Sequence, residues 1–313
     1  MVQKNLAFVF PGQGSQKIGM LADLAHEYPI VQQTFAEASH VLGYDLWDLV
    51  QNGTQESINL TECTQPLLLA SSVAVWRVWQ EVNGLQPALM AGHSLGEWSA
   101  LVCAGVVAFT DAVKLVQQRG KFMQEAVPTG HGAMAAIIGL DDLLIIEVCK
   151  KAEQDEVVSA VNFNSPGQVV IAGTAAAVER ASLLCKEAGA KRALPLPVSA
   201  PFHTSLMRPA ADRLAEQIIH TVFNAPKIPV VHNVTAQTEA NPEKIKALMI
   251  EQVYSAVRWV DCVNTLSAHD IAITVECGPG KVLSGLNKRI NAKLLTFSME
   301  KSEELINVLV SIQ

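Results

Sequence analysis

The stretch Ala88-Leu-Met-Ala-Gly92-His-Ser94-Leu-Gly96-Glu-Trp decides the fold of this chain. Its apolar start has the character of a buried strand, and the residues after Gly96 have the apolar spacing of a helix. A serine between two glycines at a strand-to-helix turn is the pattern of a nucleophile elbow. The glycines are needed because the turn brings backbone segments so close that side chains would collide. The stretch therefore predicts an α/β fold in which the turn projects the Ser94 hydroxyl as a nucleophile.

Strand-like and helix-like segments alternate on both sides of this stretch. Before it, a strand-like run at 6–10 is followed by helix-like runs at 21–42 and 66–81. Strand-like runs return at 228–234 and 271–276. Such alternation is typical of a parallel sheet with helices on its faces. We therefore predict an α/β-hydrolase-like core with a parallel sheet.

The segment 128–199 follows a different order of elements. Strands and helices are predicted in the order strand, helix, strand, strand, helix, strand, at 133–139, 141–152, 157–161, 168–173, 174–188 and 192–198. This βαββαβ order is the ferredoxin-like one, and prolines bound the segment at both ends. We therefore predict a discontinuous catalytic core, residues 1–127 and 200–313, interrupted by a ferredoxin-like subdomain at 128–199.

Composition limits the class of protein and the kinds of partner. The 313 residues are 50% hydrophobic and only 17% charged, which allows a large buried core and argues against disorder. Thirty acidic against 23 basic residues give a net charge of −7, which argues against wholesale binding of nucleic acid or of an anionic membrane. The charge-free apolar stretches are shorter than the roughly 18 residues of a membrane span.

The six cysteines are never closer than 15 residues in the chain. This spacing excludes a Cys-x-x-Cys motif and a paired zinc knuckle. The first apolar run stops at Pro11 and is too short for the core of a signal peptide. We therefore expect a reduced, cytoplasmic protein with no metal site.

A serine hydroxyl needs a nearby base, and histidine is the usual one. Among the eight histidines, His203 stands out because it follows a proline-punctuated loop at which the chain leaves the predicted insert and re-enters the core. Loops at strand ends are where α/β folds place catalytic groups. We therefore select His203 as the candidate base, and we expect His93, next to the serine, to be structural.

The loop Pro11-Gly-Gln-Gly-Ser-Gln16 follows the first predicted strand and is rich in glycine. A dinucleotide-binding loop would need a third glycine where Lys17 stands, and a phosphate-binding P-loop would need a lysine where Met20 stands. Both nucleotide-binding functions are thereby excluded. The loop either presents backbone amides to a developing oxyanion or is a tight structural turn.

Six motifs together resemble those of the malonyl-CoA:acyl carrier protein transacylase family. They are FVFPGQGSQ (8–16), AGHSLGEWSALVCAGV (91–106), QRGKFMQ (118–124), NFNSPGQVVIAG (162–173), PVSAPFHTSLM (197–207) and ECGPGKVL (276–283). The motifs follow one another through nearly the whole chain. The resemblance implies transfer of malonyl from malonyl-CoA to the phosphopantetheine thiol of acyl carrier protein for fatty acid biosynthesis, through a malonyl-serine and without a cofactor.

The resemblance also implies roles for individual residues, motif by motif. They are Ser94 as the nucleophile, His203 as its base, Arg119 as the anchor of the malonyl carboxylate, the amides of Gln13 and Leu95 as the oxyanion hole, and Gln252 as the residue whose backbone carbonyl orients the histidine. The physical chemistry agrees, because a guanidinium fork binds a carboxylate through two hydrogen bonds. Phe202 is expected to crowd the malonyl α-carbon and to disfavour a methyl-branched analogue.

The implied carrier partner is typically acidic, and local charge compensates for the net charge of this chain. No acidic residue lies between 276 and 300, and this segment contains Lys281, Lys288, Arg289 and Lys293. The pair Lys191-Arg192 forms a second basic cluster at the edge of the insert. We predict that these clusters steer the carrier protein, with a merely solvated helix face as the alternative.

Three other functions stay open. A serine esterase or thioesterase would need a triad carboxylate, for which Asp261 and Glu276 are candidates, and would have no use for Arg119. A stand-alone polyketide-type acyltransferase would share fold and mechanism and differ in its carrier. A non-catalytic carrier-binding module is disfavoured because the nucleophile, the base and the anchor are all present.

Overall fold

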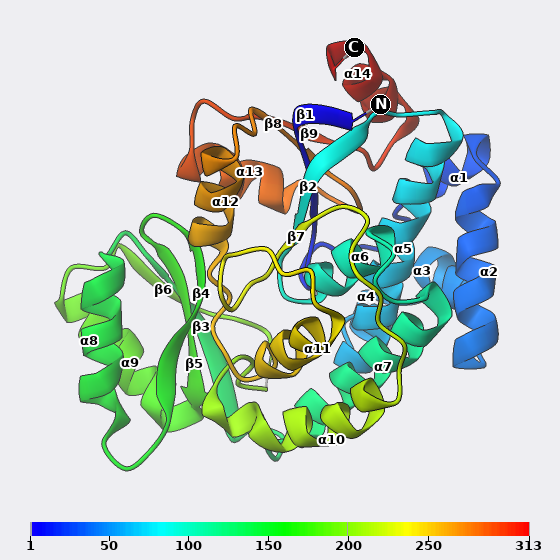
Figure 1. Cartoon of the computed structure of the whole chain (residues 1–313). Coiled ribbons are helices and arrows are strands. Elements are labelled where there is room, and N and C mark those ends of the chain that lie inside the picture. The colour runs from blue at the N-terminus through cyan, green and yellow to red at the C-terminus, as the bar shows by residue number, and fades with distance from the viewer. Residues whose placement is uncertain (1, 199, 313) are drawn as a thin grey trace.

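Two β-sheets, one parallel and one antiparallel, organise the chain (Figure 1). The structure is a computed structural model that describes residues 2–198 and 200–312, without the side chains of residues 2 and 4. Ser199, the last residue of the predicted insert, lies outside the described residues. Within the described ranges, no helix is both long enough and apolar enough to cross a bilayer.

The parallel sheet lies in the core of the molecule and has the strand order β7-β2-β1-β8-β9. Its strands are β1 (Val2–Phe10), β2 (Gln86–Gly92), β7 (Val230–Val231), β8 (Ile273–Glu276) and β9 (Leu295–Ser298). Side chains of β1 alternate between two core clusters, with Phe8 and Phe10 in one and Ala7 and Val9 in the other. All four are fully buried, because helices cover both faces of the sheet.

The two faces of the parallel sheet are covered by different helices. The larger cluster is built with α2, α5, α6 and α7, and the smaller one with α12 and α13. The helices outside the antiparallel region are α1 (Ala22–Glu27), α2 (Ile30–Leu42), α3 (Leu46–Asn52), α4 (Gln55–Ile58), α5 (Thr61–Glu81), α6 (Leu95–Cys103), α7 (Phe109–Glu125), the 3₁₀ turn η1 (Ser205–Met207), α10 (Arg208–Ile219), α11 (Pro242–Glu251), α12 (Trp259–Ala268), α13 (Val282–Ile290) and α14 (Ser302–Ile312).

The antiparallel sheet lies to one side of the core, in green in Figure 1, and has the order β4-β5-β3-β6. Its strands are β3 (Gly132–Ile138), β4 (Val158–Ser165), β5 (Gln168–Thr174) and β6 (Arg192–Pro195), with helices α8 (Asp142–Glu153) and α9 (Ala175–Glu187). Asp141 and Thr174 cap the two helices by accepting backbone N–H groups. The chain order is the predicted ferredoxin-like βαββαβ, and the predicted fold class is confirmed.

The antiparallel sheet is joined to the core along β4. The N–H of Val257, in the core, donates to the carbonyl of Val161 (2.8 Å), and the N–H of Phe163 donates to the carbonyl of Val257 (3.0 Å). The antiparallel sheet has its own core cluster with α8 and α9. This separate cluster supports the division into 1–127 with 200–313 and 128–199, which stays a prediction.

Several predicted elements differ in extent from the structure; the last strand of the insert, for example, is predicted at 192–198 and ends at Pro195. Three other differences have an identifiable physical reason. The helix predicted at 21–42 is two helices, which are separated at Tyr28 and Pro29. A residue before proline avoids the helical region, and Tyr28 is extended (φ −121°, ψ 96°). The helix predicted at 66–81 begins at Thr61, since packing of the buried residues from Thr64 onward outweighs the local cost of Pro66. The strand predicted at 228–234 pairs only over Val230–Val231, because the residues after it turn to the site described below.

Candidate active site

Ser94 stands at a strained turn between β2 and α6. Its backbone has φ 51° and ψ −105°, which a side-chain-bearing residue rarely adopts. Gly92 and Gly96 make the turn possible, because a Cβ on Gly92 would collide with the backbone of Gly96 and a Cβ on Gly96 would collide with the carbonyl of Phe10. These contacts are the steric reason that the sequence analysis gave for the Gly-x-Ser-x-Gly pattern.

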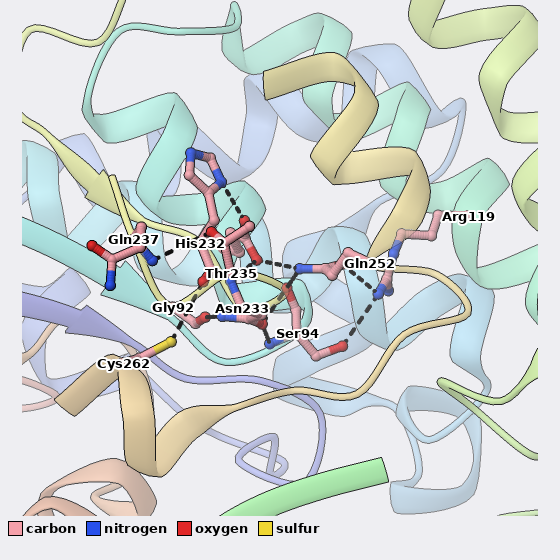
Figure 2. Close-up of polar contacts among 10 residues, drawn as sticks. Gly92, Ser94, Arg119, His232, Asn233, Thr235, Gln237, Gln252 and Cys262 are labelled. Carbon is pink, nitrogen blue, oxygen red and sulfur yellow. Dashed lines mark hydrogen bonds and ion pairs between the residues drawn. The ribbon is translucent and has the colours of Figure 1, made fainter. Parts of the chain in front are cut away.

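Asn233 holds both sides of the turn from the segment after β7. The Ser94 N–H donates to Asn233 Oδ1 (2.7 Å), and Asn233 Nδ2 donates to the Gly92 carbonyl (2.7 Å). Asn233 is fully buried, so that both hydrogen bonds are shielded from water (Figure 2). The sequence alone does not reveal this role, because Asn233 is 139 positions from the serine and belongs to no catalytic motif.

His203 contacts the serine hydroxyl directly. Its Nε2 lies 2.9 Å from Ser94 Oγ, and its Nδ1 lies 2.9 Å from the backbone carbonyl of Gln252. A carbonyl only accepts, so Nδ1 carries the proton and Nε2 is free to accept the hydroxyl proton. Burial, and secondly the charge of Arg119, lower the pKa of His203 to about 3. The imidazole is therefore neutral at pH 7, as a base must be.

Arg119 approaches the same hydroxyl from α7. Its Nη2 donates to Ser94 Oγ (3.2 Å) and to Gln252 Oε1 (3.0 Å), and its Nη1 donates to Gln65 Oε1 (2.8 Å). Burial lowers the pKa of Arg119 to about 10 against the opposing charge of Glu97, so the guanidinium remains a cation at pH 7. Arg119 Nε is buried and has no hydrogen-bond partner among the described residues.

The residue after Arg119 explains how α7 comes so close to α5. A Cβ on Gly120 would lie 2.5 Å from the Thr61 carbonyl oxygen, so only glycine permits this approach. The approach brings Gln65 of α5 within hydrogen-bond distance of the guanidinium. Gln65 is a second residue that the sequence analysis missed, because its α5 neighbours are mostly apolar and only the helix contact makes it part of the site.

A cavity of about 120 Å³ opens beside the serine. Loops and helices of the core and two strands of the antiparallel sheet contribute to its wall, which consists of Gln13, Gln65, His93, Ser94, Arg119, Met123, Met134, Asn162, Leu196, Val198, Phe202 and His203. One part of the wall is polar and the rest is apolar. The cavity therefore accommodates a small group with a charged end.

The two predicted oxyanion donors lie beside the serine in sequence or in space. Leu95 is the first residue of α6, and the first N–H groups of a helix make no intrahelical hydrogen bond. Gln13 lies in the loop after β1 and lines the cavity. A Cβ on Gly12 would lie 2.5 Å from the His93 carbonyl oxygen, so this glycine lets the loop approach the serine turn.

The two carboxylates considered for an esterase triad lie elsewhere. Asp261 Oδ2 pairs with Arg258 Nε (2.8 Å) near the surface. Glu276 is buried and accepts the N–H groups of Leu283 (3.1 Å) and Ser284 (2.8 Å) at the start of α13. Neither carboxylate contacts His203, whose Nδ1 faces a neutral carbonyl instead.

One carboxylate does lie in the site, and the sequence analysis missed it. Glu97 is 1% exposed and accepts from His232 Nδ1 (2.6 Å), from the Asn233 N–H (3.1 Å) and from Gln252 Nε2 (2.6 Å). The sequence signal that could have indicated this role is an acidic residue at the start of an otherwise apolar helix. The described residues contain no cluster of three or more histidine, cysteine or acidic side chains placed to hold a metal ion.

The basic residues predicted to contact a carrier lie outside the cavity. All five, Lys191, Arg192, Lys281, Lys288 and Arg289, are exposed. Arg289 Nη1 donates to Gln168 Oε1 (2.6 Å), which joins α13 to β5. A second groove runs between α13 and the antiparallel sheet and shares Gln13 and His93 with the cavity wall. The α13 cluster thus lies beside a path that leads towards Ser94.

The sequence and the fold both match known proteins. The acyl transferase domain family matches residues 7–289. A curated malonyl CoA-acyl carrier protein transacylase from Escherichia coli K12 is 62% identical over 91% of this chain and 92% of that protein.

Solved structures extend this similarity. An acyl carrier protein S-malonyltransferase from Vibrio cholerae has a TM-score of 0.96 and 61% identity, covering 97% of this chain and 99% of that one. A malonyl-transacylase solved in complex with its type II polyketide acyl-carrier protein has a TM-score of 0.97 and 56% identity, covering 98% and 99%. These matches span nearly the whole chain at high identity, and the chain belongs to the malonyl CoA-acyl carrier protein transacylase family.

Proposed function

We propose that this chain transfers malonyl from malonyl-CoA to the phosphopantetheine thiol of acyl carrier protein through an ester on Ser94. The product, malonyl-acyl carrier protein, supplies fatty acid biosynthesis. The observation that carries the proposal is the approach of His203 Nε2 (2.9 Å) and Arg119 Nη2 (3.2 Å) to the same Ser94 Oγ. A base beside the hydroxyl provides for acyl transfer, and a buried cation beside it provides for an acyl group with its own carboxylate.

In the first half-reaction, His203 Nε2 takes the Ser94 proton while Oγ attacks the thioester carbonyl carbon. The resulting oxyanion accepts hydrogen bonds from the N–H groups of Gln13 and Leu95, each contributing about 3 to 4 kcal/mol to the barrier reduction. The carbon–sulfur bond then breaks, and the coenzyme A sulfur leaves with the proton from His203. Malonyl remains as an ester on Ser94.

The second half-reaction reverses these steps with a new thiol. His203 takes the proton of the carrier phosphopantetheine thiol, and the sulfur attacks the ester carbonyl carbon. The Ser94 oxygen leaves and recovers its proton from His203. Gln252 holds the imidazole through a neutral carbonyl in both directions, so that no negative charge competes with the malonyl carboxylate for Arg119.

Arg119 and Phe202 account for acyl selection. The guanidinium binds the malonyl carboxylate with donors that include the unpartnered Nε. Phe202 is 9% exposed and lines the cavity, which supports its proposed crowding of a branched α-carbon. One methyl group is worth about 1 to 3 kcal/mol of discrimination, so we expect partial exclusion of a methyl-branched analogue.

Mass spectrometry of the intact protein and of its peptides tests the proposal. After mixing with malonyl-CoA, we expect one malonyl group on the peptide that contains Ser94 and its discharge by holo acyl carrier protein. Ser94→Ala should abolish the adduct. The matched control is Ser99→Ala in the same helix, a residue outside the cavity wall, which should keep it. An adduct on another peptide, or none on the wild type, would refute the assignment.

A polyketide carrier is a second candidate partner. One relative at 56% identity was solved with a type II polyketide acyl-carrier protein. Discharge of the malonyl adduct by fatty-acid and polyketide carriers, measured side by side, separates the two. An esterase would instead discharge it to water, which the positions of Asp261 and Glu276 away from His203 disfavour.

The cytoplasmic location and the division into a core with an inserted subdomain also belong to this proposal. All six cysteines are free thiols in the structure, which supports a reducing compartment. The separate core cluster of the antiparallel sheet supports a subdomain at 128–199.

A further inference from the structure

Gln252 offers two hydrogen-bond acceptors to the site at once. Its backbone carbonyl faces His203 Nδ1 (2.9 Å), and its side-chain Oε1 accepts from Arg119 Nη2 (3.0 Å). The residue is fully buried at the end of α11. Figure 2 shows its amide between Arg119 and the Ser94 turn. Only one amide orientation gives this arrangement, because a flipped amide would direct its NH₂ group at the guanidinium, donor against donor.

Glu97 and the Ser94 carbonyl together determine which orientation the amide takes. Gln252 Nε2 donates to Glu97 Oε2 (2.6 Å) and to the Ser94 carbonyl (2.9 Å). A carboxylate and a carbonyl accept and never donate, so the NH₂ group must face them. The side-chain oxygen of Gln252 is thereby directed at Arg119.

The carboxylate of Glu97 is itself held in place. It is the third residue of α6, where the helix dipole favours negative charge. His232 Nδ1 contacts Oε1 (2.6 Å), and the Asn233 N–H donates to Oε2 (3.1 Å). Among the described residues, no lysine or arginine lies within ion-pair distance of Glu97.

Glu97 is therefore linked to Arg119 by hydrogen bonds only through the amide of Gln252. A carboxylate in direct contact would occupy the guanidinium and compete with an acyl carboxylate for it. One intervening amide orients the guanidinium and leaves its remaining donors to the substrate. Arg119 Nε, which has no hydrogen-bond partner among the described residues, shows that the protein does not use every donor of the guanidinium.

We propose that Glu97 is a positioning residue that fixes the Gln252 amide and thereby aligns Arg119 for an acyl group with a free carboxylate. The inference rests on the proposed function and deepens it, because it adds a selectivity role to a residue that touches neither the substrate nor Ser94 Oγ. Its effect must appear in the preference for malonyl over a neutral acyl group. A merely structural role would lower both reactions equally.

Glu97→Gln is the decisive variant. It keeps the size of the side chain, but its terminal group both donates and accepts, so the charge-assisted contact is lost and only the Ser94 carbonyl still favours this orientation of the Gln252 amide. Rapid-quench loading of Ser94 from malonyl-CoA and from acetyl-CoA gives the ratio of kcat/KM values. We expect this ratio to fall about tenfold, the effect of losing one charge-assisted hydrogen bond, mainly through a higher KM for malonyl-CoA. An unchanged ratio would overturn the inference.

Two further variants keep the test conclusive. Ser99→Ala, in the same helix and outside both the cavity wall and this hydrogen-bond network, is the control and should leave the acyl ratio unchanged. Gln252→Met keeps the backbone carbonyl and removes the amide, so it should reduce the ratio as Glu97→Gln does, even if the latter does not fold. In the double variant the ratio should fall no further; an additive loss would contradict action through Gln252.

The wild-type result separates this inference from the proposed function. If wild-type protein takes no malonyl on Ser94, the proposed function fails. If it takes malonyl and Glu97→Gln keeps the wild-type acyl ratio, only the positioning role fails.

Discussion

The buried site around Ser94 and the exposed face of α13 use positive charge in opposite ways. Arg119 is 2% exposed and is held by side-chain oxygens of Gln65, Ser94 and Gln252. Lys288 and Arg289 are exposed to solvent, where salt screens their charge. The buried groups act through fixed geometry at the reacting atoms. The surface groups contribute mainly to the rate at which the carrier protein is encountered. Variants in the two regions should therefore differ by orders of magnitude.

Replacement of His203 should have the largest effect. His203→Ala removes the base 2.9 Å from Ser94 Oγ, and the loading rate should fall by about 10²- to 10⁴-fold. Rapid-quench measurement of malonyl-Ser94 formation provides the rate. His40→Ala, at an exposed position of α2, is the control and should load normally. A loss of less than tenfold in His203→Ala would contradict its role as the base, because the effect would be no larger than that expected for the surface variants.

Replacement of Arg119 should act on the choice of acyl group. Arg119→Ala removes a charge-assisted contact to the malonyl carboxylate, so kcat/KM for malonyl-CoA should fall about ten- to a hundredfold relative to acetyl-CoA. Arg119→Lys keeps the charge but loses the planar fork, and should recover only part of the preference. Equal losses for both acyl groups would mean that Arg119 supports the serine and does not select the substrate.

The pH dependence reports on the electrostatics of the buried histidine. Because burial and then Arg119 lower the pKa of His203 to about 3, the base stays neutral at pH 5 and loading should show no acid limb near the ordinary histidine value of about 6.5. Between pH 3 and about pH 6.5, His203 is neutral in the folded state and protonated in the unfolded chain, so the folded state binds fewer protons. The contribution of this group to the free energy of unfolding therefore falls as pH falls from about 6.5 towards 3.

Two measurements check this expectation. Single-turnover loading at pH 5 and pH 7 should give similar rates, and a drop centred near pH 6.5 would show a solvated imidazole. Urea unfolding of wild type and His203→Gln over the same range should show a steeper loss of stability with acid in the wild type.

Charge reversal on α13 should have the smallest effect. Lys288→Glu with Arg289→Glu should raise KM for the carrier protein about two- to fivefold at low salt, and the difference should vanish at high salt. Lys150→Glu with Lys151→Glu makes the same change in net charge on exposed residues of α8 and is the matched control. If the α13 pair leaves KM and its salt dependence unchanged, the face is merely solvated.

Much of the fold follows from short-range patterns in the sequence. The strand, turn and helix around Ser94 follow from apolar spacing and from glycines that admit close backbone approach. The helix starts after Asp141 and Thr174 follow from caps that bond within three residues. These features depend on neighbours in the chain, so one sequence contains their signal. The proline-punctuated loop before His203 indicated this residue, and a family motif extended the prediction to Arg119.

The sequence by itself determined the serine turn, the alternation of strands and helices, and the types of residue available for acyl transfer. Only the tertiary structure decided that Asn233 clamps the turn, that Gln65 meets Arg119, and that Glu97 acts through Gln252. The physical reason is that a buried polar side chain has no local signature. Its partners lie far along the chain, and only packing of the sheets and helices brings donors to within hydrogen-bond distance of acceptors.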